Sequence, residues 1–230
     1  MDTILTLNFW FDMARGPFVW LSLLIGFLGS VVMTRRVLAV TSMNTPFRQR
    51  SGRTPQKKFR LFALLFDGLG TWIRNSVMGS YPGVITVSIV FHVLLFSIPL
   101  LLLAHNMLLE DAVGLSLWSM PEEAAESLTQ VFLACLGFFL VRRIVSPRVR
   151  SITEISDYGV LVMTAAPFVT GLLALHQIGD YKLMLTLHML SGELMLLMAP
   201  FTKVYHMVFF FVGRFILVNE HTLGKGSRTW

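Results

Sequence analysis

The sequence predicts an all-α fold, an integral membrane bundle of five transmembrane helices. The first observation is composition: of 230 residues, 54% are hydrophobic and only 14% are charged, and the mean hydropathy is +0.67. An ordinary soluble domain is more charged and less apolar than this. The second observation is that the apolar residues gather in five runs, each near the length of about 20 residues that crosses a bilayer as a helix. The third is that basic residues collect between alternate runs.

The five runs define the expected spanning helices, all within one membrane domain that covers residues 1–230. Their approximate ranges are 17–34, 84–108, 124–141, 158–175 and 183–211. Between the first two lies a basic, amphipathic loop, 35–80, in which Lys57–Ser76 mixes basic with apolar residues. Such a segment suits a helix lying in the membrane interface, or one that docks a partner subunit, and the sequence does not separate the two.

The placement of the 19 basic residues predicts the orientation of the chain. Nine lie between the first two runs, four between the third and fourth, and four close or follow the fifth, which leaves only Arg15 and Lys182 for the other side. By the positive-inside rule the three basic regions are cytoplasmic, so the N-terminus is periplasmic and the C-terminus cytoplasmic. We expect a multi-pass protein of the cell inner membrane. The basic loops are interpreted as topology signals in contact with lipid headgroups, not as a nucleic-acid-binding surface.

Four of the six histidines fall in two apolar runs: His92 and His105 in the second, His188 and His206 in the fifth. Polar side chains at membrane depth are costly, so a functional use is expected for them. His188 and His206 are 18 residues apart. On one continuous helix this spacing is five turns, so both imidazoles would share a face about 27 Å apart. Matching by depth pairs His92 with His206 near the cytoplasmic face, and His105 with His188 near the outer face.

Each matched pair could hold one haem iron between two neutral imidazoles. This ligation leaves no open coordination site, so it suits electron transfer rather than oxygen activation. The single cysteine, Cys135, excludes a disulfide framework and covalent haem attachment. We therefore expect two haem b groups, an inner haem on His92 and His206 and an outer haem on His105 and His188. The only metal expected is the haem iron, and no residue is expected to be catalytic.

The spacing of His92 and His105 leaves the outer ligand open. Thirteen residues on an ideal helix place the two imidazoles roughly 140° apart in direction. Pro99 lies between them, and a kink there could turn both toward the fifth run. His176, at the outer end of the fourth run, is an alternative ligand for the outer haem, unless it is a surface loop histidine.

Two residues near the histidines of the fifth run could support a haem. Gly192 follows His188 by one turn on the same face, where a porphyrin needs close approach to backbone, although it could equally allow tight helix packing. Lys203 precedes His206 by three residues. Its ammonium could pair with a haem propionate or extend to lipid phosphate.

Three carboxylates are candidates for quinone or proton chemistry. Glu193 lies deep within the fifth run, where it is expected to hydrogen-bond a haem or a neighbouring helix, or to belong to a proton pathway. Glu110 and Asp111 follow His105 directly. They are placed to accept protons from a quinol at the outer haem, or they belong to a solvated loop.

Three motifs resemble those of the nitrate reductase gamma-subunit family, the dihaem quinol-oxidising membrane cytochromes b. The matching residues are His188-x3-Gly192-x7-Pro200-Phe201-Thr202-Lys203-x2-His206, Ser146-Pro147-Arg148-Val149-Arg150 and Phe91-His92. The resemblance covers the five-run layout and is most specific in the C-terminal part of the chain. It implies the same two haem pairs, His92 with His206 and His105 with His188.

Two features depart from respiratory nitrate reductase. The histidines of the second run are one helical turn further apart, and the third run has no lysine to match the one implicated there in quinol binding. The compact size and the start at Arg15-Gly16-Pro17-Phe18-Val19-Trp20 are more similar to the cytochrome b subunits of the Hmc, Tmc and Dsr transmembrane redox complexes of sulfate reducers. In those complexes a periplasmic multihaem cytochrome c and a cytoplasmic iron–sulfur protein flank the membrane subunits.

The expected function is that of a dihaem electron-transfer subunit in a quinone-linked oxidoreductase complex of a respiratory chain. It would relay electrons between a menaquinone pool or a periplasmic cytochrome c and a cytoplasmic iron–sulfur subunit, alongside other membrane subunits. The alternative is a membrane anchor, with one haem or none, that holds redox partners together.

Overall fold

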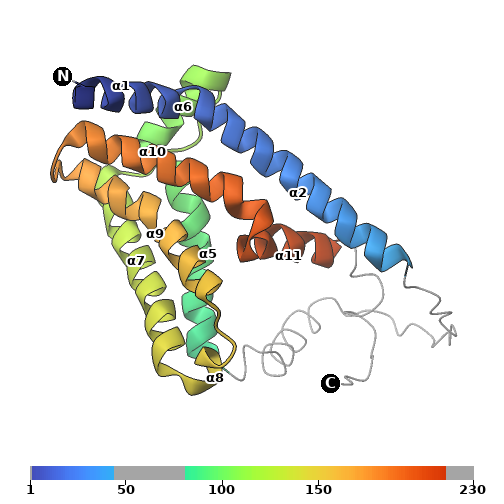
Figure 1. Cartoon of the computed structure of the whole chain (residues 1–230). Helices are drawn as coiled ribbons and strands as arrows, with labels where there is room; N and C mark the ends of the chain where they lie inside the picture. Colours follow the sequence, from blue (N-terminus) through green and yellow to red (C-terminus); the bar gives the residue numbers. More distant parts are fainter. Residues whose placement is uncertain (1, 44–80, 216–230) are drawn as a thin grey trace, which may run out of the picture. The chain divides into compact units, whose positions relative to one another are not determined.

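The computed structural model describes residues 2–43 and 81–215, and within these ranges the chain is helical and contains no strand (Figure 1). Five of the described helical segments are long and apolar enough to cross a membrane. They are Pro17–Ala39, Pro82–Leu101, Glu122–Val145, Ile155–Leu175 and Tyr181–Phe201. The predicted fold class is therefore confirmed, and the chain is a multi-pass membrane protein. The interfacial segment predicted at Lys57–Ser76 lies outside the described residues.

The chain divides into two compact units. The larger unit comprises residues 1–46 and 146–230, and the smaller unit comprises residues 47–145. The larger unit contains three of the five spanning segments and the smaller unit two. The single membrane domain over 1–230 stays a prediction.

In the larger unit, α10 (Tyr181–Met198) packs against α1 (Asp2–Arg15), α2 (Pro17–Met43) and α9 (Ile155–Leu175) (Figure 1). The packing of α2 on α10 is close enough to require glycine. A Cβ atom on Gly26 would lie 2.9 Å from the carbonyl oxygen of Leu196. Small residues permit this approach of two backbones, a common way for membrane helices to associate.

Polar contacts also fix α1 on α10. The Lys182 ammonium donates a hydrogen bond to the side-chain oxygen of Asn8 and lies 4.8 Å from the centre of the Phe11 ring. Hydrogen bonding and a cation–π contact together lower the cost of placing this charge beside apolar helices. The N-terminal region before the first span is therefore a helix packed in the larger unit.

The smaller unit is built on α5 (Pro82–Leu101) and α7 (Glu122–Val145), which pack side by side. Phe91 of α5 stacks on Phe132 of α7, with ring centroids 4.9 Å apart, and Phe132 is completely buried. A second ring of α7, Phe139, meets Phe91 edge-on at 5.5 Å. This aromatic cluster fixes the rotation of α5 about its axis, and so the direction in which the next residue, His92, points.

The second span ends earlier than predicted. We expected one helix over 84–108, but α5 ends at Leu101, and Leu102 is extended, with φ −71° and ψ 130°. A separate helix, α6 (Leu103–Val113), then begins. The proline between the two histidines, Pro99, lies inside α5, and the helix continues past it to Leu101. His105 consequently lies on α6 and not on the spanning helix that carries His92.

The fifth run is also interrupted, so the prediction of one helix over 183–211 is wrong. After α10 come two short 3-10 turns, η1 (Ala199–Phe201) and η2 (Lys203–Tyr205), and then α11 (His206–Phe215). Thr202, between the turns, is extended. Pro200 cannot donate a backbone hydrogen bond, so the α-helical pattern ends there. His188 and His206 therefore lie on separate helices, and the shared face and 27 Å rise expected from five continuous turns do not apply.

The other spans extend past their predicted ranges. The helix α2 continues to Met43, so the first residues of the predicted loop 35–80 are helical, and α7 continues through Arg142 to Val145. A charged residue marks where a chain leaves the hydrocarbon layer, but it does not end a helix. Between α7 and α9, the segment that begins Ser146-Pro147 forms a short helix, α8 (Pro147–Arg150).

Candidate functional site

The four predicted ligand histidines share one feature, a hydrogen bond from the ring Nδ1 atom to a backbone carbonyl oxygen. The pairs are His92–Ser88 at 2.7 Å, His105–Pro99 at 2.9 Å, His188–Pro167 at 2.7 Å and His206–Lys203 at 2.6 Å. A carbonyl only accepts, so Nδ1 carries the proton in each of these bonds. In a neutral imidazole the coordinating lone pair is then on Nε2. Metal-ligating histidines commonly have this arrangement, so the donor set fits a haem ligated through Nε2.

His188 is the histidine whose orientation depends most on a second helix. Its hydrogen-bond acceptor, the carbonyl of Pro167, belongs to α9, while the histidine belongs to α10. One turn after Pro167, a Cβ atom on Gly171 would lie 3.0 Å from His188 Nδ1 and 3.1 Å from its Cε1. The imidazole therefore lies directly against the backbone of α9. Only glycine at position 171 leaves this space without a shift of the ring.

Gly192, predicted to leave room for a porphyrin, faces open space. A Cβ atom built there would meet nothing within 4 Å in the part of the chain that the structure describes, apart from the backbone of its own helix. The alternative role for Gly192, tight packing against another helix, therefore has no support among these residues. The porphyrin role stays a prediction.

His92 is half-buried on α5 beside the aromatic cluster of the smaller unit. The ring of Phe91 meets its imidazole edge-on, with centroids 5.1 Å apart. Ser88, one turn earlier, contributes both its carbonyl oxygen and, at 3.4 Å, its hydroxyl to Nδ1. Local sequence thus orients this ring, since the acceptor lies four residues away on the same helix.

His105 lies beside a connection that folds back onto the helix break. The neighbouring Asn106 is buried, accepts a hydrogen bond from the Leu117 N–H at 3.1 Å and donates one to the Ser119 hydroxyl at 3.0 Å. Met120 N–H donates to the carbonyl of Leu101 at 2.9 Å. These bonds fix the segment 114–120 against the start of α6.

His176 caps the C-terminal end of α9, where it is exposed. The choice between His105 and His176 as the outer ligand stays open. His92 and His105 belong to the smaller unit, whereas His188 and His206 belong to the larger one. Each predicted pair takes one histidine from each unit, and both pairings stay predictions.

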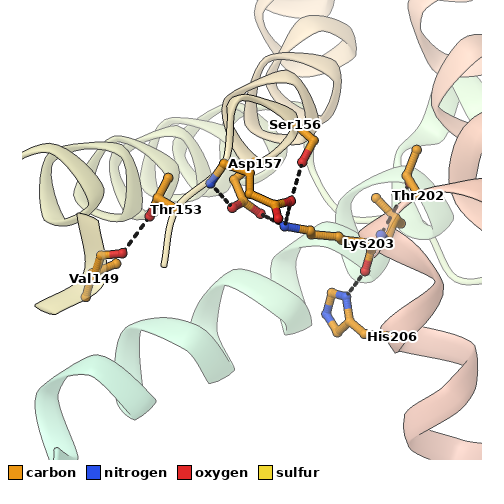
Figure 2. Close-up of polar contacts among 9 residues, drawn as sticks. Val149, Thr153, Ser156, Asp157, Thr202, Lys203 and His206 are labelled. Atoms are coloured by element: carbon orange, nitrogen blue, oxygen red, sulfur yellow. Dashed lines mark hydrogen bonds and ion pairs between the residues drawn. The ribbon is translucent and has the colours of Figure 1, made fainter. Parts of the chain in front are cut away.

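Lys203 has partners that the sequence did not indicate. Its ammonium lies 2.9 Å from Glu154 Oε2 and 3.0 Å from Asp157 Oδ1, at the start of α9 (Figure 2). The hydrogen bond from Lys203 lowers the pKa of Glu154, and the bond to Glu154 raises the pKa of Lys203. The predicted partners of Lys203 were a haem propionate or a lipid phosphate. In the structure its charge is matched by two carboxylates of the same unit, and the propionate and lipid roles stay predictions.

The three carboxylates predicted for quinone or proton chemistry differ sharply in environment. Glu110 and Asp111 are exposed on the last turns of α6. Glu193 is buried on α10, with 9% of its surface exposed, and its Oε1 atom has no hydrogen-bond partner among the described residues. A buried polar atom without a partner is costly, which makes Glu193 a candidate for a functional role.

No family model matches the chain. A protein of Nitratidesulfovibrio vulgaris strain Hildenborough is 33% identical over 219 residues, a match that covers 93% of this chain and 94% of that protein. The chain belongs to the same family as this protein. The near-complete coverage of both chains extends the relationship over all five spans.

Three residues that contact the histidines of the larger unit, or the turn before His206, were not predicted from the sequence. Gly171 contacts His188 from α9, Asp157 pairs with Lys203, and Tyr205 bonds across to α2 through Thr34. Two signals were available: a glycine within an apolar span and an acidic residue in the first turn of a spanning helix. Neither signal indicates which residue is contacted, because each contact joins residues far apart in the sequence.

Proposed function

We propose that this chain is the dihaem b-type membrane subunit of a respiratory redox complex. It relays electrons between a menaquinone pool or a periplasmic multihaem cytochrome c and a cytoplasmic iron–sulfur subunit. The inner haem is held by His92 and His206, and the outer haem by His105 and His188. The chain lies in the cell inner membrane with its N-terminus in the periplasm.

The observation that carries the proposal is the shared Nδ1–carbonyl bond of all four histidines. Each bond keeps the proton on Nδ1, which fixes the tautomer and makes Nε2 the more basic ligand. A haem ligated by two such imidazoles supplies one-electron transfer at a closed coordination site. The acceptor of His188 belongs to another helix, so this bond does not follow from the local geometry of α10.

The similarity to a protein of Nitratidesulfovibrio vulgaris supports the narrower proposal. This relative comes from a sulfate-reducing bacterium, the group in which the Hmc, Tmc and Dsr complexes occur. The proposed partners follow from those complexes. A basic cytoplasmic surface would receive the iron–sulfur subunit. Residues 44–80 of the predicted basic loop 35–80 lie outside the described residues.

The acidic residues beyond His105 have a role in the quinone part of the proposal. Glu110 and Asp111 are exposed on α6, where their carboxylates can accept protons released on quinol oxidation. Glu193 is a second proton-binding candidate, because it is buried on the same helix as His188.

The decisive experiment counts haem in the purified chain and in single histidine variants. The wild-type chain should show a reduced-minus-oxidised b-type α band and two haems per polypeptide. His92→Ala and His206→Ala should each remove the same spectral component, and His105→Ala and His188→Ala the other. His176→Ala is the matched control, expected to keep both haems.

Four outcomes would change the proposal. Full haem content in both His92→Ala and His206→Ala contradicts the inner pair. Loss of haem in His176→Ala with retention in His105→Ala would make His176 the outer ligand. Absence of haem from the wild-type chain leaves the anchor function. A quinol analogue that reduces neither haem, together with no response to quinone-site inhibitors, would contradict the quinone role.

A further inference from the structure

The segment that leads into His206, the first residue of α11, is a short turn. Thr202 is extended, with φ −118° and ψ −179°, and the three residues Lys203–Tyr205 form the 3-10 turn η2. The Thr202 hydroxyl accepts a hydrogen bond from the Val204 N–H at 3.3 Å, and Val204 is buried. A 3-10 turn has few backbone bonds of its own, so its position depends on contacts with other elements.

Two residues of the turn make such contacts, each with a different helix. Lys203 reaches the start of α9 through Glu154 and Asp157, as Figure 2 shows. Tyr205, two residues later, shares a 2.9 Å hydrogen bond with the hydroxyl of Thr34 on α2. The turn is therefore attached to two different helices of the larger unit.

Of the two carboxylates that contact Lys203, that of Asp157 is the one expected to fix the lysine, because it is buried. Its side chain is 8% exposed, whereas that of Glu154 is 70% exposed. An exposed ion pair is screened by water and contributes little, while a buried carboxylate needs its partner. Asp157 Oδ2 also accepts the Glu154 N–H at 2.9 Å, which fixes the carboxylate at the helix start.

The same residue, Lys203, contacts His206 through its backbone. Its carbonyl oxygen lies 2.6 Å from His206 Nδ1, and Figure 2 shows the lysine between the carboxylates and the imidazole. The side chain of Lys203 thus ties the turn η2 to the start of α9, and its carbonyl is the hydrogen-bond partner of the His206 ring.

We propose that Lys203 is a positioning residue for His206, with Asp157 as its fixed anchor and the Tyr205–Thr34 bond as a second support. This inference rests on the proposed function of His206 as a haem ligand. Lys203 therefore acts through carboxylate pairing and its backbone carbonyl, and not by contact with a propionate. Removal of a group that hydrogen-bonds to a ligating histidine and orients its ring commonly lowers metal affinity 10–100-fold.

The test measures haem loss from the purified full-length chain, by transfer of haem to apomyoglobin, together with the low-spin electron paramagnetic resonance signal. Lys203→Met and Asp157→Asn should speed the loss of the His206-ligated haem about tenfold or more and shift its signal. Asp157→Asn keeps an oxygen for the Glu154 N–H, so it removes the charge and preserves the cap. Tyr205→Phe removes one hydroxyl and should produce a smaller change in the same haem.

Two controls separate positioning from a general loss of stability. Glu154→Gln removes the exposed carboxylate and should behave like wild type. Lys203→Arg keeps the ion pair with Asp157 and should restore slow haem loss. The signal of the other haem should be unchanged in every variant.

The inference is overturned if Lys203→Met and Asp157→Asn retain the inner haem and its signal while His206→Ala loses them. It is also overturned if Glu154→Gln has the same effect as Asp157→Asn. Haem retention would then depend on the total negative charge near Lys203 and not on its pairing with Asp157. Retention of both haems in His206→Ala would contradict the proposed function itself, and this inference with it.

Discussion

His188 and Pro167 lie on neighbouring helices of the larger unit, and the Nδ1 atom of the histidine is 2.7 Å from the carbonyl oxygen of the proline. The two residues are 21 positions apart in the sequence. The orientation of a candidate haem ligand on α10 is thus set by the backbone of α9. Because Gly171 lies against the same ring, a change in α9 alone should alter the chemistry of His188.

The first prediction concerns Gly171. Gly171→Ala places a Cβ atom 3.0 Å from His188 Nδ1, so the ring must shift and its bond to Pro167 must lengthen. We expect loss of the outer haem about tenfold faster than in wild type, and faster still in Gly171→Val. Haem transfer to apomyoglobin measures this rate. Gly159→Ala on the same helix is the matched control, because a Cβ there meets nothing within 4 Å among the described residues, apart from the backbone of its own helix. Equal haem retention in Gly171→Val and wild type would refute the prediction.

The second prediction concerns Asn106. Its amide makes two hydrogen bonds that hold the segment 114–120, and it is 3% exposed. Asn106→Leu leaves the Leu117 N–H and the Ser119 hydroxyl without their partner, which should cost about 1–3 kcal/mol of stability. Thermal unfolding in detergent measures this cost, with Asn106→Asp as the comparison that keeps one acceptor. A stability equal to wild type in Asn106→Leu would show that the segment is held by other contacts.

The third prediction concerns Glu193. Its Oε1 atom is buried and has no partner among the described residues, so the carboxyl group destabilises the folded chain. Glu193→Leu should raise the free energy of unfolding by about 1–3 kcal/mol, while Glu193→Gln, which keeps a buried polar group, should not. Thermal unfolding in detergent distinguishes the two variants. Destabilisation by Glu193→Leu would mean that the carboxyl group binds a partner, such as a proton-donating ligand.

If Glu193 binds a proton together with haem reduction, the same variants have a second effect. In Glu193→Gln the potential of the nearby haem should lose part of its pH dependence, because the amide cannot exchange that proton. Redox titrations at several pH values measure this slope. An identical slope in Glu193→Gln and wild type would exclude Glu193 from the coupled proton.

The fourth prediction concerns orientation. The exposed residues Leu115 and Ile152 lie before and after the spanning helix α7, so they should face opposite sides of the membrane. In a Cys135→Ser background, Leu115→Cys should react with an impermeant thiol reagent in cells with a permeable outer membrane. Ile152→Cys should react only after the inner membrane is opened. The reverse pattern would place the N-terminus in the cytoplasm.

The sequence alone determined the fold class and the number of spans. A helix that crosses the hydrocarbon layer must have a minimum length and few charges. Both properties can be counted in the sequence without knowledge of which residues are in contact. The sequence also selected the four histidines, because a polar side chain in an apolar run is unusual wherever its neighbours lie. It did not reveal where α5 and α10 end. A kink was predicted at Pro99, whereas α5 continues past this proline and ends at Leu101, and α10 ends at Met198, two residues before Pro200.

Only the tertiary structure decided how the histidines are held. His92 takes its acceptor from Ser88, one turn away, and that bond follows from helix geometry. The ring of His188 is held by Pro167 and Gly171 of another helix, and Lys203 is held by a carboxylate from a segment 46 residues earlier in the chain. Local sequence determines which residues are polar and which are apolar. The partner of each polar group depends on which helices pack together, and that is a property of the folded chain as a whole.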